Sequence, residues 1–95
     1  MIKVIAEFFV KPEALDIVVK LAKELVTETK KEVGCLAYNL FMDDADNARL
    51  VIIEEWESQE ILDIHSDSEH FKRLVPSMVY LCDKAPIIRT YTEIV

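Results

Sequence analysis

The chain has 95 residues, 52% of them hydrophobic, and a net charge of −7. This length suits one domain, and the negative charge argues against nucleic acid as a partner because phosphate backbones would be repelled. No apolar run approaches the ~18 residues of a membrane span, the first residues lack the build of a signal peptide, and the single glycine, Gly34, excludes a glycine-rich nucleotide-binding loop. We therefore expect a single cytoplasmic domain over residues 1–95 that is not associated with a membrane.

The first third of the chain predicts a strand followed by a long helix. Apolar positions alternate with mixed ones from Ile2 to Val10, which indicates a strand that ends at Lys11-Pro12. From Glu13 to about Glu32 the apolar residues recur three or four positions apart, as on one face of an amphipathic helix. Gly34 stands where a left-handed residue can end this helix.

Two strands follow, from Cys35 to Met42 and from Leu50 to Trp56. The turn between them, residues 43–47, is rich in Asp and Asn, whose side chains bond their own backbone. The second of these strands is apolar on both faces until it reaches Glu54 and Glu55. A sheet with one wet face would alternate apolar with polar residues, so we expect both faces to be covered.

The last third of the chain predicts a broken helix and a final strand. Ser58 can cap a short helix that ends at His65, and residues 66–69 have the serine-to-glutamate spacing of a capping box for a second helix. Pro76 within the second helix is expected to kink or divide it. The run from Ile87 to Ile94 predicts a last strand.

This order of elements, βαββαβ, predicts a ferredoxin-like α+β sandwich with an antiparallel four-stranded sheet and both helical segments on one face. The helices cannot cover all the large aromatic residues of the strands, namely Phe8, Phe9, Tyr38, Phe41, Trp56 and Tyr91. We therefore expect a homodimer in which the uncovered faces of two sheets pack together. Pockets are expected between sheet and helices or between the two sheets.

Several short motifs occur together in a known order. Gly34-Cys35 opens the second strand, Glu54-Glu55-Trp56 ends the third, His65 ends the short helix, and His70-Phe71 begins the next. In this combination the chain resembles the antibiotic biosynthesis monooxygenase domain, including its small quinol monooxygenases. The resemblance implies a dimer whose paired sheets form an α+β barrel. Pro12-Glu13 departs from the Pro-Gly often found in the family, but this change concerns a turn.

The resemblance implies several possible activities. Relatives include quinol and anthrone oxygenases without a prosthetic group, haem-degrading enzymes and an isomerase of a signalling molecule. We expect the first activity here: oxidation of a small quinol- or anthrone-like aromatic substrate by dioxygen, with no cofactor and no metal. The haem-degrading branch has an asparagine on the first strand, where this chain has Glu7, Phe8 and Phe9. His65 and His70, five residues apart, lack a metal-ligand spacing.

Three further possibilities stay open: a haem-binding or haem-degrading protein, an isomerase of a small oxygenated metabolite, and a dimeric binding protein without catalysis.

Oxygenation without a cofactor requires proton removal, stabilisation of the resulting oxyanion and exclusion of water. His65 titrates near neutrality and is a candidate base. Glu54 becomes one if burial raises its pKa, and Arg89 is a candidate partner for an anionic oxygen. The candidates for substrate binding are the aromatic and amide side chains Trp56, Tyr38, Asn39, Phe71 and Tyr91.

Three of the candidates have an alternative structural role. Trp56 can be a core or interface anchor, His65 can bond a carbonyl at a helix end, and Arg89 can form a surface ion pair. Glu54 and Glu55 point to opposite faces of their strand. The sequence leaves open which of the two enters a pocket.

Overall fold

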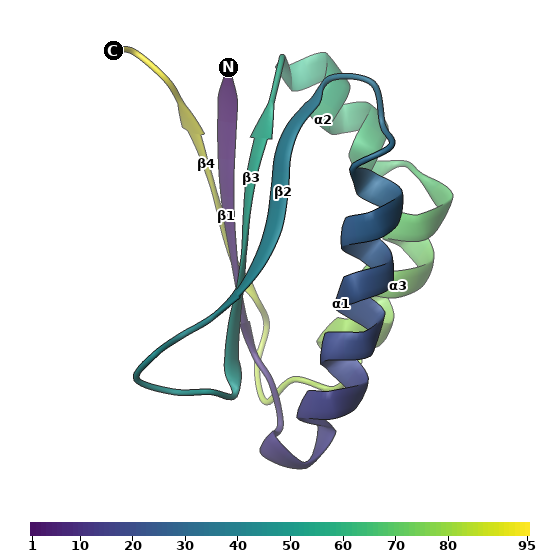
Figure 1. Ribbon diagram of the computed structural model, residues 1–95, viewed down its shortest axis with the longest axis vertical. Helices are drawn as coiled ribbons and strands as arrows, with labels where there is room; N and C mark the ends of the chain where they lie inside the picture. The colour runs from purple at the N-terminus through teal and green to yellow at the C-terminus, as the bar shows by residue number, and fades with distance from the viewer.

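The computed structural model describes residues 1–95 and shows a four-stranded sheet with all helices on one face (Figure 1). The elements in chain order are β1 (Ile2–Phe9), the 3-10 turn η1 (Pro12–Ala14), α1 (Leu15–Thr29), β2 (Cys35–Met42), β3 (Arg49–Trp56), α2 (Gln59–Ser66), α3 (Glu69–Tyr80) and β4 (Ile87–Thr92). The strands pair antiparallel in the order β2-β3-β1-β4. The predicted ferredoxin-like βαββαβ fold is therefore confirmed.

The turn after α1 depends on the single glycine. Gly34 has a φ of +86°, a left-handed conformation that residues with a side chain rarely adopt. A Cβ at this position would also lie 2.6 Å from Cγ2 of Ile61 in α2. Gly34 thus allows both the reversal of the chain into β2 and the close approach of α2.

The helix starts follow local capping, with one correction to the prediction. The Ser58 hydroxyl accepts a hydrogen bond from the Ile61 amide and caps α2 as expected. The capping box predicted at residues 66–69 does not form, because Ser66 still belongs to α2 and Ser68 caps α3 by accepting from the Phe71 amide. α3 also continues through Pro76, so this residue does not divide the helix.

Pro76 is exposed, as is Lys72 four residues before it. The carbonyl that loses its amide partner therefore lies on the side of α3 that water can reach, where the missing bond is tolerated best.

The core lies between the helices and the facing side of the sheet. One set of alternating side chains from β1 and β3 meets the apolar stripes of α1 and α3 there. The fully or almost fully buried residues of this core include Val4, Phe8, Val18, Leu25, Tyr38, Leu50, Ile52, Trp56, Leu74 and Met78.

The other face of the sheet has no helix over it (Figure 1). The strand registers direct Ile5, Ile53, Phe41 and Tyr91 to this face, and 49% of Phe41 and 47% of Tyr91 remain exposed. As predicted, the helices do not cover all the large aromatic residues: Phe8, Tyr38 and Trp56 are buried, whereas Phe41 and Tyr91 are not. None of the helices combines the length and apolar character needed to cross a membrane.

Candidate active site

A cavity of about 200 Å³ lies between the sheet and helices α2 and α3. Sixteen residues line it and ten are hydrophobic, including Phe8 of β1, Ile52 of β3 and Val75 of α3. Three polar side chains of the lining are buried: Tyr38, Glu54 and His65. Such a mostly apolar cavity with a few convergent polar groups is the usual form of a site for a small molecule.

Glu54 is the glutamate that faces this cavity. It lies on the same face of β3 as Ile52 and Trp56 and is 6% exposed, whereas Glu55 points to the face without helices. The Trp56 indole Nε1–H donates a hydrogen bond of 2.9 Å to Glu54 Oε1. Burial raises the pKa of Glu54 to about 7, although the bond from Trp56 opposes this shift. Glu54 can therefore hold or release a proton near neutral pH.

His65 lies in the last turn of α2 and is 1% exposed. Its ring packs against Trp56, with centroids 4.5 Å apart, and against the edge of Phe71 at 5.2 Å. Nδ1 lies 2.7 Å from Oε2 of Glu32, while Nε2 is buried without a hydrogen-bond partner. Burial lowers the pKa of His65, and the bond to Glu32 opposes this shift.

The partner at Nδ1 selects the tautomer of His65. A carboxylate can only accept hydrogen bonds, so the proton shared with Glu32 belongs to Nδ1. In the neutral ring Nε2 then carries a free lone pair. His65, which lines the cavity, therefore has a buried proton acceptor at Nε2.

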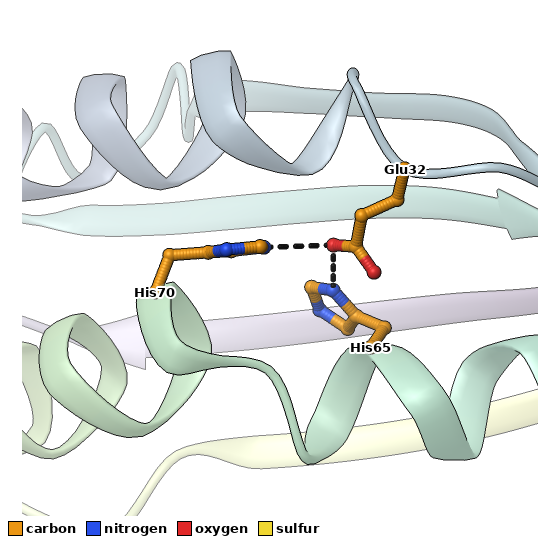
Figure 2. Close-up of side chains that lie close together, drawn as sticks. All are labelled: Glu32, His65 and His70. Carbon is orange, nitrogen blue, oxygen red and sulfur yellow. Dashed lines mark hydrogen bonds and ion pairs between the residues drawn. The ribbon is translucent and has the colours of Figure 1, made fainter.

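Glu32 was not predicted from the sequence. It lies in the turn after α1, and Oε2 also meets Nε2 of His70 at 2.8 Å (Figure 2). In the sequence Glu32 is one more charged residue at the polar end of an amphipathic helix, 33 positions before His65. The one available signal is the nearby Gly34, because its turn brings this segment back against α2.

The structure brings several of the predicted site residues together. Glu54, His65, Tyr38 and Phe71 all line the cavity. Trp56 is fully buried and does not line it, but it orients Glu54 and packs against His65. Burial, and then the charge of Glu54, raise the pKa of Tyr38, so its hydroxyl stays protonated over the physiological range.

The remaining candidates lie on the opposite face of the sheet. Asn39 pairs across the strands with Ile53 of β3. Arg89 and Tyr91 pair with Ile5 and Lys3 of β1, and all these side chains lie on the face without helices. On β4 it is Ile88 and Thr90, the neighbours of Arg89, that line the cavity. Alternation along the strands thus places Arg89 and Glu54 on opposite faces of the sheet, so Arg89 does not reach the cavity that Glu54 lines.

An apolar cavity with buried titratable groups, over a sheet of this topology, is suited to binding a small molecule and exchanging protons with it. The model of the family "Antibiotic biosynthesis monooxygenase" matches residues 1–77. The chain belongs to this family and is a monooxygenase-type oxidoreductase.

Similar proteins support the same conclusion. A crystal structure described as an antibiotic biosynthesis monooxygenase is 45% identical, with both chains covered completely and a TM-score of 0.96. A conserved protein from Methanosarcina mazei Go1 is 37% identical over 95% of this chain and 89% of that one, with a TM-score of 0.93. "Putative monooxygenase Rv0793" of Mycobacterium tuberculosis is 36% identical over 70 residues, which make up 74% of this chain and 68% of that protein.

Proposed function

We propose that this protein uses dioxygen to oxidise a small quinol- or anthrone-like aromatic substrate without a prosthetic group. The observation that carries the proposal is a mostly apolar cavity lined by both Glu54 and His65, with the Nε2 atom of His65 buried and without a hydrogen-bond partner. An apolar cavity of about 150 Å³ holds benzene. A cavity of about 200 Å³ therefore suits an aromatic compound somewhat larger than one ring.

Proton removal from the substrate begins the proposed reaction. His65 Nε2 accepts a proton from a substrate hydroxyl, and Glu32 stabilises the imidazolium that forms, as a carboxylate does in a catalytic triad. The electron-rich substrate anion then reduces dioxygen. One oxygen atom enters the ring as a hydroxyl group and the other leaves as water, so a quinol becomes a hydroxyquinone and supplies all four electrons.

Glu54 and Tyr38 provide the polar contacts in this proposal. Glu54 has a pKa of about 7 and can exchange a proton with a second substrate oxygen. The protonated Tyr38 hydroxyl can donate a hydrogen bond to an anionic oxygen. The surrounding apolar wall excludes water, which strengthens both interactions.

We also propose that two copies pair through the face of the sheet without helices. Phe41, Tyr91 and Ile87 are between 38% and 49% exposed there, and burial of apolar surface contributes roughly 25 cal/mol per Å². Asn39 and Arg89 would then lie at the interface between the sheets. The free thiols of Cys35 and Cys82 suit a reducing compartment, which supports a cytoplasmic location.

An isomerase of a small oxygenated metabolite is the second candidate, because Glu54 and His65 line the same cavity and together could move a proton between two carbon atoms. Haem degradation has less support. On β1 the cavity is lined by Val4, Ala6 and Phe8, none of which offers a polar side chain toward a haem.

Oxygen uptake by chelator-treated protein with a reduced naphthoquinone tests the proposal. The wild type should accelerate uptake above the rate in buffer, and His65→Gln should lower that gain by about 10²–10⁴-fold, the usual contribution of a general base. Glu57→Gln, at an exposed position beyond β3, is the control for handling and purity. No acceleration by the wild type, or full activity of His65→Gln, would contradict the proposal. Substrate conversion without oxygen uptake would instead support the isomerase.

A further inference from the structure

We propose that Glu32, His65 and His70 form a binding site for one divalent transition-metal ion, with Zn²⁺ as the best-suited probe. The proposal goes beyond oxidation of an aromatic substrate. It assigns a ligand to three side chains that otherwise only bond one another.

The donor atoms of the three residues converge on one point. One possible ligand atom from each residue lies within 4.8 Å of the other two, and Glu32 Oε2 lies 2.7 Å from His65 Nδ1 and 2.8 Å from His70 Nε2. They come from three different segments, namely the turn after α1, the end of α2 and the first turn of α3 (Figure 2). Two imidazoles and a carboxylate form a common ligand set for Zn²⁺ that leaves a coordination position open.

The charges around this cluster favour a cation. Glu32 has no ion pair with a lysine or arginine, and its only charged or polar partners are the two histidines. The nearby Lys31 pairs instead with Glu28, at 2.8 Å. A half-buried carboxylate without a permanent positive partner is stabilised by a bound divalent ion.

The position of the cluster gives an ion a route from solvent. The His65 side chain is 1% exposed, but those of His70 and Glu32 are 16% and 15% exposed. The ion would therefore enter past His70 and Glu32 and meet His65 last. The Nδ1 atom of His65 faces the cluster, and the buried Nε2 atom is on the other side of the ring. An ion at Nδ1 therefore does not occupy the position of a substrate hydroxyl at Nε2.

Metal binding at Nδ1 changes what His65 can do at the cavity. A neutral imidazole that coordinates through Nδ1 carries its proton on Nε2. His65 then becomes a hydrogen-bond donor where the metal-free protein has an acceptor. The ion thus switches off proton acceptance, a consequence that rests on the function proposed above.

Metal titration of chelator-treated protein tests the site directly, without reference to activity. Calorimetry with Zn²⁺ should give one site per chain, and Co²⁺ should give visible d–d absorption. His70→Gln and Glu32→Gln should each weaken binding at least tenfold. Glu28→Gln, which removes a nearby carboxylate outside the cluster, should bind as the wild type does.

Three results would overturn the site: no binding by the wild type, equal binding by His70→Gln, or a Co²⁺–thiolate charge-transfer band that shows cysteine ligation. Oxygen uptake with and without Zn²⁺ then tests the switch. Saturation with Zn²⁺ should lower the rate of oxygen uptake at least tenfold, both for the wild type and for Glu28→Gln. Tight binding with no effect on the rate would refute the switch but leave the site intact.

Discussion

Glu54→Gln should make the protein more stable at neutral and alkaline pH. The carboxyl is 6% exposed, and burial raises its pKa from an ordinary value of 4.5 to about 7 in the folded chain. Below pH 4.5 both the folded and the unfolded chain hold the proton. Between pH 4.5 and 7 the unfolded chain releases it first, so the free energy of unfolding falls as the pH rises.

The size of this effect follows from the two pKa values. Each pKa unit corresponds to about 1.4 kcal/mol, so ionised Glu54 lowers stability by about 3 kcal/mol above pH 7. Glutamine has a similar shape and does not titrate. The difference in unfolding free energy between Glu54→Gln and the wild type should therefore move by about 3 kcal/mol in favour of the variant between pH 4.5 and 8.

Urea unfolding at a series of pH values measures this difference, at one protein concentration because association affects apparent stability. Glu57→Gln is the control, since it makes the same change in formal charge at an exposed position. A difference between Glu54→Gln and the wild type that stays constant from pH 4.5 to 8 would refute the assignment of a raised pKa to Glu54.

Two further substitutions test other contacts of the fold. Trp56→Phe keeps an aromatic ring beside His65 but removes the N–H bonded to Glu54. This substitution should lower the free energy of unfolding, measured with urea, by about 1–3 kcal/mol at pH 8. The loss should be smaller at pH 5. Equal losses at the two pH values would show that this bond does not depend on ionised Glu54. Gly34→Ala places a methyl group 2.6 Å from Ile61 at a φ of +86°. This substitution should lower the free energy of unfolding by at least about 1 kcal/mol, which corresponds to a fall of roughly 4–8 °C in the melting temperature. An unchanged melting temperature would contradict the requirement for glycine.

The sheet could be predicted because strand alternation is a local property. Residues 35–42 form β2 with the predicted bounds, and the opposite orientation of Glu54 and Glu55 follows from the same rule. The rule does not say which face the helices cover. That choice depends on how the apolar stripes of α1 and α3 dock, and it decides that Glu54 reaches the cavity while Arg89 does not.

The cluster around Glu32 could not be predicted because it is a long-range arrangement. Glu32 lies 33 and 38 positions before His65 and His70. The spacing of five between the two histidines gives no ligand motif, because the third residue of the proposed ligand set comes from the turn after another helix. The N-cap of α3 was predicted two positions too early, at Ser66. α2 extends through Ser66, and Ser68 caps α3.

Labelled dioxygen provides the most direct test of the proposed oxygenation. Chelator-treated protein, a reduced naphthoquinone and ¹⁸O₂ should give a hydroxylated quinone with one ¹⁸O atom in each product molecule, measured by mass spectrometry above a buffer control. A product whose new oxygen comes from water, or a quinone without added oxygen, would contradict the account.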